Sequence, residues 1–202
     1  MIRVPPRRGG WLEVICGPMF SGKSEEMIRR LRRAEIAGQR IVIFKPRIDD
    51  RFDASDVVSH AGARMRGVPV GSVGELVARA RGFEVVGIDE VQFFDRGVVA
   101  AALDLADGGA RVVVAGLDQD FRRLPFGPIP DLLSHAEFVD KLQAVCHPCG
   151  GPATTTQRLV DGHPAPYSGE TVVVGAAEQY EARCRDCHEP GADSSLGASA
   201  AA

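Results

Sequence analysis

Residues 17–24 read Gly17-Pro18-Met19-Phe20-Ser21-Gly22-Lys23-Ser24 and carry more information about the fold than any other segment. They fit the pattern G-x-x-x-x-G-K-[ST], in which the glycines let successive backbone N–H groups point into one hollow. Such a hollow, at the start of a helix, favours phosphate oxygens. We expect Lys23 to reach the β- and γ-phosphates of a nucleotide and Ser24 to bind Mg²⁺ through its hydroxyl.

The flanking segments supply the structural context for this loop. The apolar run 11–16 predicts a short buried strand, and from Glu25 the apolar residues recur at helical spacing until Gly38, a typical helix stop. A phosphate loop is expected between a strand and a helix, so this order makes a chance match improbable.

The rest of the first 145 residues repeats the alternation of strand and helix. Because such alternation gives a parallel sheet covered on both faces, the chain is predicted to be an α/β protein. The predicted strands are 40–44, 83–88, 111–117 and 138–145, the predicted helices 72–80 and 97–106, and the predicted loops 45–71 and 118–130.

A second motif supports nucleotide binding. The apolar strand that ends at Ile88 is followed by Asp89 and Glu90. In proteins with a phosphate loop, an aspartate at such a strand end holds Mg²⁺. Glu90 would then lie beside the γ-phosphate and take a proton from an attacking oxygen. That oxygen can belong to water, as in an ATPase, or to a substrate hydroxyl, as in a kinase, and the two motifs alone leave both open.

Four of the five cysteines form two C-x₂-C pairs, Cys146/Cys149 and Cys184/Cys187. Two such pairs complete a tetrahedral zinc site without a place for water, so the metal would be structural. The alternatives are unrelated thiols or a redox pair, but a redox C-x-x-C is usually single and lies at a helix start. His147 and His188 are interpreted as spectators or minor alternative ligands, and Cys16 as a small buried apolar residue.

Composition excludes several classes of protein. The 202 residues include 24 Lys and Arg and 27 Asp and Glu, a net charge of −3, which argues against a protein that covers nucleic acid with positive charge. No apolar run approaches the roughly 18 residues that a membrane helix needs. Arginines in residues 1–10 are not followed by an apolar signal region, so we expect a cytoplasmic protein without a membrane partner.

Together with the phosphate loop and the cysteine pairs, several further segments resemble type II thymidine kinases. These are Asp89-Glu90-Val91-Gln92-Phe93, Gly116–Phe121 followed by Pro125-Phe126-Gly127, and Val172–Ala176 running towards Tyr180. They occur in the order of that family and cover about residues 11–188.

The resemblance implies a RecA-like P-loop sheet over residues 11–145 and a zinc-held domain over 146–190, whose lasso-shaped loop closes over a nucleoside. Residues 1–10 would be an N-terminal extension and 191–202 a disordered tail. The implied reaction transfers the γ-phosphoryl of ATP to the 5′-hydroxyl of thymidine, giving dTMP in nucleoside salvage, or to that of deoxyuridine. The family is typically a homotetramer inhibited by dTTP, and no nucleic-acid partner is expected.

The resemblance also implies roles for single residues. Glu90 matches the general base, and Ser24 and Asp89 match the magnesium ligands. ATP-binding positions are Gly17, Pro18, Met19, Phe20, Ser21, Gly22, Lys23, Ser24, Asp89 and Gln92. Substrate-binding positions are Met19, Phe93, Leu117, Phe121, Thr156, Val172, Val173, Val174, Gly175, Ala176 and Tyr180, and the zinc ligands are Cys146, Cys149, Cys184 and Cys187.

At two positions the chain departs from the family pattern. Val91 stands where alanine is usual and would tighten the space behind the catalytic strand end, and Ala176 stands where a second glycine is common. If that position requires a positive φ, alanine would be strained there.

Two other functional hypotheses share the nucleotide motifs. A DNA-stimulated ATPase with a zinc ribbon is disfavoured by the acidic balance and by the absence of a basic and aromatic stripe. A non-catalytic nucleotide-binding regulator is disfavoured by the intact set of Lys23, Ser24, Asp89 and Glu90.

Overall fold

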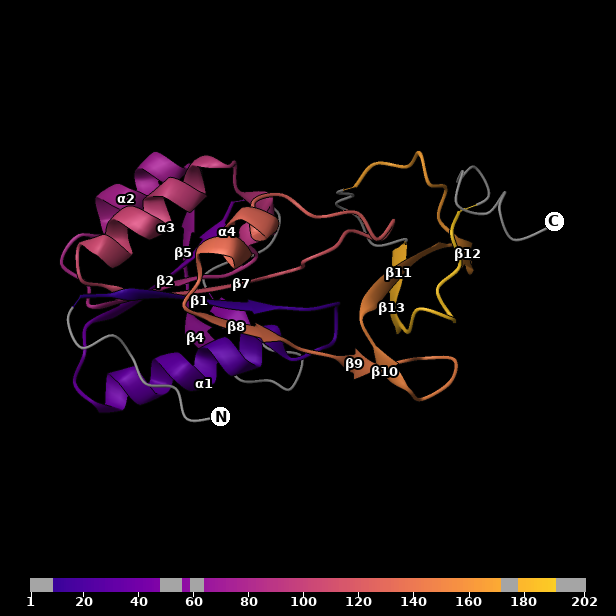
Figure 1. Cartoon of the computed structure of the whole chain (residues 1–202), viewed down its shortest axis with the longest axis horizontal. Helices are drawn as coiled ribbons and strands as arrows, with labels where there is room; N and C mark the ends of the chain where they lie inside the picture. The colour runs from indigo at the N-terminus through magenta and orange to yellow at the C-terminus, as the bar shows by residue number, and fades with distance from the viewer. Residues whose placement is uncertain (1–8, 48–55, 59–63, 172–177, 192–202) are drawn as a thin grey trace.

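The structure, a computed structural model, describes residues 9–47, 56–58, 64–171 and 178–191. Figure 1 shows two parts side by side: a helix-covered sheet that carries the N-terminal two thirds of the chain, and a smaller group of strands, β9 to β13, at its right. The predicted N-terminal extension lies outside the described residues except for its last two positions, and the predicted tail except for Gly191.

The larger part is built on a six-stranded sheet in the order β5-β2-β6-β7-β1-β8. Every neighbouring pair in it is parallel, as the alternating sequence pattern predicted. Its strands are β1 (Trp11–Cys16), β2 (Ile41–Pro46), β5 (Val68–Val70), β6 (Val85–Ile88), β7 (Arg111–Gly116) and β8 (Phe138–Lys141).

Helices cover both faces of this sheet, which confirms the predicted α/β class. Helix α1 (Lys23–Ile36) lies on one face, and α2 (Val73–Ala80), α3 (Gly97–Asp107) and α4 (Ile129–His135) lie on the other (Figure 1). Because side chains alternate along a strand, Val14 packs with the three-helix layer and Ile15 packs with α1. The two apolar clusters hold β1, and hence the loop that follows it, in the middle of the sheet.

Local signals in the sequence account for the helix ends. Ser72, the first residue of the predicted helix 72–80, caps α2 by accepting a hydrogen bond from Glu75 N at 3.2 Å. Gly38, with φ +78°, follows the last residues of α1 and takes the left-handed conformation that ends many helices.

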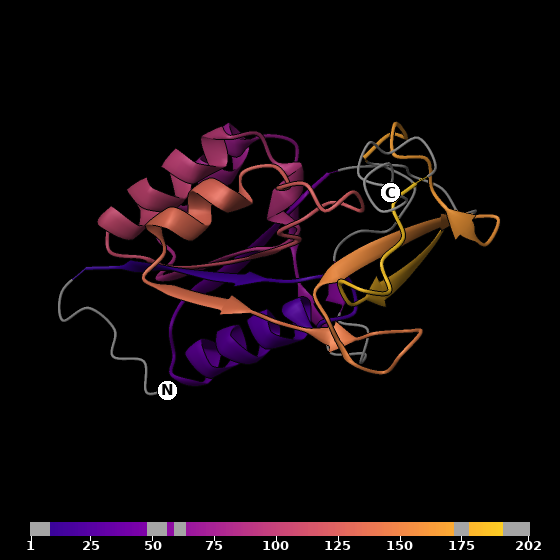
Figure 2. The ribbon, with the colours of Figure 1, turned by 45° about the vertical axis from the view of Figure 1, so that its right-hand side comes forward.

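The smaller part is antiparallel. Strand β9 (Ala144–Val145) pairs with β10 (Pro152–Ala153), and β11 (Thr155–Val160) lies between β12 (His163–Pro164) and β13 (Glu178–Arg183). Figure 2 shows these strands beyond the end of β8, from which the chain runs directly into β9. The apolar cluster recorded here buries only small residues, Ala144, Cys146, Ala153 and Ala182.

Several sequence predictions are wrong in detail. Residues 45–71 are not one loop, since the described parts include a hairpin of β3 (Asp56–Val58) and β4 (Arg64–Arg66), and β5 joins the central sheet. Pro69 hides β5 from sequence patterns, yet at a sheet edge its missing N–H is tolerated. The predicted strand 138–145 is divided into β8 and β9.

Helix α4 was missed altogether because prolines surround it. Pro130 lies in its first turn, where a helix has no use for the missing N–H. Helix α1 begins at Lys23, two residues before the predicted start. None of the helices in the described part of the chain is long and apolar enough to cross a membrane.

Candidate active site

The phosphate loop lies between β1 and α1, as predicted, and its shape depends on two glycines. Gly17 and Gly22 have φ values of +141° and +82°, which side chains rarely allow. A Cβ on Gly17 would also lie 2.5 Å from Leu142 O. Ser21 Oγ and Lys23 Nζ both donate to Pro18 O, at 2.8 and 2.7 Å, so the loop closes on itself.

Lys23 holds its charge in a nearly closed environment. Lys23 is 9% exposed, and this burial lowers its pKa. The nearby carboxylates of Glu90 and Asp89 raise the pKa but do not fully offset the effect of burial. A buried cation beside backbone N–H groups at a helix start is suited to a phosphate group.

Asp89 follows β6 directly and faces Ser24. It is 7% exposed, and burial together with the charge of Glu90 raises its pKa to about 7, against the opposing effects of Glu90 N, Lys23 and a hydrogen bond from Ser24. The two predicted magnesium ligands are therefore in contact. A hydroxyl and a poorly solvated carboxylate beside a second carboxylate form an oxygen-rich, electron-rich donor set, which fits Mg²⁺.

Glu90 adopts a left-handed backbone conformation with φ +50°. For a residue with a side chain this conformation costs roughly 1 kcal/mol or more, and such strain concentrates at functional sites. The turn is fixed by Phe93 N and Phe94 N, which donate to Glu90 O and Val91 O. Val91, the departure from the family pattern, is fully buried in the core behind this turn.

The segment 117–127 joins β7 to α4, contacts the smaller part through Phe121 and His188, and is held by internal hydrogen bonds within the predicted loop 118–130. Asp120 accepts hydrogen bonds from Arg122 N and Leu124 N at 2.9 and 3.0 Å and pairs with the Arg122 guanidinium at 2.7 Å. These contacts hold Phe121 in a buried position.

Of the predicted substrate residues, Met19 and Thr156 meet across the two parts, Phe93 lies in the larger part and Tyr180 in the smaller. Met19 N donates to Thr156 Oγ1 at 3.0 Å, which joins the phosphate loop to β11. Phe93 packs edge-to-face against Phe126, with ring centroids 5.6 Å apart. Tyr180 lies on β13 opposite Arg158 of β11. The segment Val172–Ala176 lies outside the described residues.

A model of the family described as thymidine kinase matches residues 10–188, which is most of the chain. The chain belongs to the thymidine kinase family. It is therefore a kinase, and the family implies nucleotide and thymidine as its substrates. This membership accounts for a phosphate loop and an acidic strand end in one chain with two C-x₂-C pairs.

In this thymidine kinase family member, the four paired cysteines come together as predicted. The Sγ atoms of Cys146, Cys149, Cys184 and Cys187 all lie within 4.8 Å of one another. Cys149 Sγ and Cys184 Sγ are 3.8 Å apart, about the separation that Zn–S bonds of ~2.3 Å give in a tetrahedron. The donor set and its spacing fit a structural zinc ion.

The pKa values of the cysteine thiols also favour a bound cation. Burial raises the pKa of Cys146, but hydrogen bonds from the backbone N–H groups and thiols of Cys184 and Cys149 outweigh it and lower the pKa to about 6. Hydrogen bonds from the neighbouring Cys184 and Cys149 sulfurs, with burial, raise the pKa of Cys187 to about 12. All four sulfurs become thiolates together only when a metal ion balances their charge.

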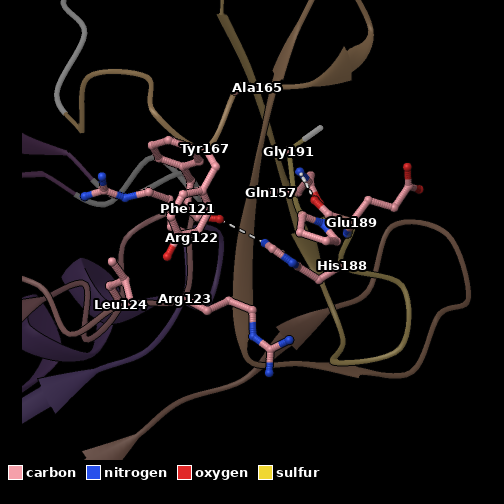
Figure 3. Close-up of a pocket in the computed structure, with 11 residues that line it drawn as sticks. Phe121, Arg122, Arg123, Leu124, Gln157, Ala165, Tyr167, His188, Glu189 and Gly191 are labelled. Carbon is pink, nitrogen blue, oxygen red and sulfur yellow. Dashed lines mark hydrogen bonds between the residues drawn. The ribbon is translucent and has the colours of Figure 1, made fainter. Parts of the chain in front are cut away.

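A cavity of about 480 Å³ separates segment 117–127 from the smaller part (Figure 3). His188 spans one wall, where its Nε2 contacts Phe121 O at 2.9 Å. Because a carbonyl only accepts, this nitrogen carries the proton, and burial lowers the pKa of the ring. The lining residues are Phe121, Arg122, Arg123, Leu124, Gln157, Ala165, Tyr167, His188, Glu189, Pro190 and Gly191.

Sequence reasoning missed the roles of two groups. His188 was assigned as a spectator or minor ligand, but it joins the end of the second cysteine pair to Phe121. Asp118, after β7, pairs with Lys141 at the end of β8 at 2.7 Å, beside the phosphate loop. The pair of Asp118 and Lys141 joins distant segments, so the sequence near either residue does not indicate it. For His188, the one indication in the sequence was its position next to Cys187.

Proposed function

We propose that this kinase transfers the γ-phosphoryl group of ATP to the 5′-hydroxyl of thymidine, giving dTMP in nucleoside salvage, or to that of deoxyuridine. The observation that carries the proposal is the convergence of Lys23, Asp89 and Glu90 at one end of the sheet. That end meets the smaller part through the contact between Met19 and Thr156, so donor and acceptor groups can be held at one junction.

Positioning and charge neutralisation account for the proposed catalysis. Residues 17–24 and Asp89 bind ATP, and Lys23 and the loop amides neutralise the transferred phosphoryl group. Ser24 and Asp89 would hold Mg²⁺, which supplies further charge neutralisation on the phosphate oxygens. Glu90 orients the 5′-hydroxyl and accepts its proton as the bond from that oxygen to the γ-phosphorus forms and the bond from the γ-phosphorus to the departing ADP breaks.

The acceptor pocket would be shared by both parts of the molecule. Met19, Phe93, Leu117 and Phe121 would enclose the base, with Thr156 and Tyr180 from the smaller part. We propose that the backbone of residues 172–176 recognises the O4 and N3–H edge of thymine, because a site built on such hydrogen bonds rejects a mismatched partner strongly.

The smaller part has a supporting role in this proposal. Its cysteines would hold Zn²⁺ and so fix residues 146–190 as one unit against a nucleotide-binding unit of residues 11–145. We further propose a cytoplasmic homotetramer that is inhibited by dTTP.

The test is a transfer assay with γ-labelled ATP across the common deoxynucleosides, with zinc measured on the same sample. Labelled monophosphate should form from thymidine or deoxyuridine, and zinc should be present at one ion per chain. Release of inorganic phosphate that single-stranded DNA stimulates, without label transfer to any nucleoside, would instead support the ATPase hypothesis.

A further inference from the structure

Gln92 is a polar side chain in an almost closed position next to the catalytic strand end. It is 3% exposed and lies two residues after Glu90 in a short 3₁₀ turn, η1 (Val91–Phe93). A buried amide is costly unless its groups find partners, so its hydrogen bonds identify what it does.

The partners of Gln92 come from two different elements. Its Oε1 accepts a hydrogen bond from Leu117 N at 3.1 Å, and its Nε2 donates to Glu90 Oε2 at 2.5 Å. Because a backbone N–H only donates, the contact with Leu117 fixes which end of the amide is the oxygen. The NH₂ group is thereby directed at the Glu90 carboxylate.

The surroundings leave Gln92 little room to move. A Cβ on Gly116 would lie 2.4 Å from Gln92 Oε1, and a Cβ on Gly127 would lie 2.4 Å from Gln92 O. Gly116, just before segment 117–127, therefore lies against the side-chain amide of Gln92, and Gly127, at the end of that segment, lies against its backbone carbonyl. The side chain of Gln92 therefore lies between the Glu90 carboxylate and segment 117–127, which carries Phe121.

We infer that Gln92 is a positioning residue that aims the Glu90 carboxylate and couples its orientation to the segment that carries Phe121. The inference rests on the proposed function of Glu90 as the base. The Glu90 carboxylate, on a strained and half-exposed turn, can adopt several rotamers. The Gln92 NH₂ group, fixed by the hydrogen bond from Leu117 N to Gln92 Oε1, selects one of these rotamers. When Leu117 moves with its segment, the amide and the Glu90 carboxylate move too.

This role differs from direct nucleotide binding, the role implied for Gln92 by the family resemblance. The oxygen and the NH₂ group of its amide both form hydrogen bonds with other residues of the protein. A residue that binds ATP directly should change the KM for ATP when it is replaced, whereas a residue that aims Glu90 should lower kcat and leave that KM nearly unchanged.

Two variants of similar shape separate the two hydrogen bonds. Gln92→Glu can still accept from Leu117 N, but it replaces the donor to Glu90 with a second carboxylate oxygen. Gln92→Met loses both contacts. We expect each variant to lower kcat by about 10²-fold, as a misplaced catalytic group does, with both KM values within threefold of wild type. Gln39→Glu, an exposed change of the same charge, should leave turnover unchanged.

A double-mutant cycle with Glu90→Gln tests whether Gln92 acts through Glu90. In the Glu90→Gln background, Gln92→Glu should change the residual turnover by less than threefold. The inference would be overturned if Gln92→Glu kept wild-type turnover, or if Gln92→Glu lowered turnover as much in the Glu90→Gln background as in wild type. Either result would leave the proposed function intact. Wild-type turnover in Glu90→Gln alone would instead overturn the proposed role of Glu90, and this inference with it.

Discussion

The two parts of this kinase hold themselves together by different means. The parallel sheet is buried on both faces by large apolar side chains, such as Phe44, Leu31 and Ile129. The apolar cluster of the antiparallel part buries three alanines and one cysteine, and the four paired sulfurs lie within 4.8 Å of one another. The parallel part is therefore held by a large apolar core, whereas the antiparallel part has a small core and a cysteine cluster that can hold a metal ion.

Removing the metal should have the largest effect of any change and should affect only one part. We expect Cys187→Ser to lose the zinc ion and the hydrogen-exchange protection of β11 and β13, because structural zinc contributes on the order of 10 kcal/mol in small domains. Thymidine phosphorylation should disappear while ATP binding stays. His147→Ala, the matched control, should keep the metal; equal loss in both variants would break the comparison.

A core truncation should affect the other part. Leu31 is fully buried under the sheet, so Leu31→Ala should lower the free energy of unfolding by about 2–5 kcal/mol. Denaturant unfolding measures this change, and zinc content should remain at the wild-type value. Ile36→Ala, at a position that is 86% exposed, should change stability by less than about 0.5 kcal/mol. Zinc loss in Leu31→Ala would show that the two parts unfold as one.

The sheet also contains a buried ionic cluster, which predicts a pH dependence. Glu13 is 3% exposed and pairs with Arg30 at 2.8 Å and Arg111 at 2.7 Å. Burial raises its pKa, but hydrogen bonds from Arg111 and Trp11 and both arginine charges outweigh this and lower it below 4.5. A lowered pKa in the folded state stabilises the fold above pH ~4.5, and this stability is lost as pH falls through the folded value.

Glu13→Gln should therefore lower the free energy of unfolding at pH 7 by about 2 kcal/mol. The loss is moderate because Arg30 keeps its partners Glu26 and Asp140. Denaturation between pH 3 and pH 7 should show a flatter pH dependence in the variant than in wild type. If the free energy of unfolding depended on pH equally in the two proteins, the lowered pKa of Glu13 would not be the cause of the pH dependence.

The smallest effect is expected where the two parts touch. His188→Ala removes the hydrogen bond to Phe121 O, a contact worth roughly 1–2 kcal/mol. The KM for thymidine should rise about tenfold, with the KM for ATP and the zinc content unchanged. Steady-state kinetics measures both, and an equal rise in the two KM values would contradict a role at the junction.

The elements around the phosphate loop were predictable because their signals are local. Residues 11–16, 85–88 and 111–116 are apolar runs, and Ser72 caps its helix through a neighbour three residues away. The spacing of the cysteines predicted a cluster that the structure confirms. What failed was either very short, as β5 was, or masked by prolines, as α4 was.

The contacts that organise the candidate site could not be predicted. Gln92 meets Leu117 and His188 meets Phe121, pairs far apart in sequence that only the packed fold brings together. Motif spacing identifies which residue types are present at a site, but the partners of buried polar groups depend on tertiary packing.

Single-turnover transfer from γ-labelled ATP to thymidine, compared between wild type and Glu90→Gln, tests the central claim most directly. The account predicts a loss of about 10²-fold or more in the transfer rate of the variant, with ATP and thymidine affinity within threefold of wild type. Transfer at the wild-type rate in Glu90→Gln would contradict the claim that this carboxylate prepares the acceptor hydroxyl at the junction of the two parts.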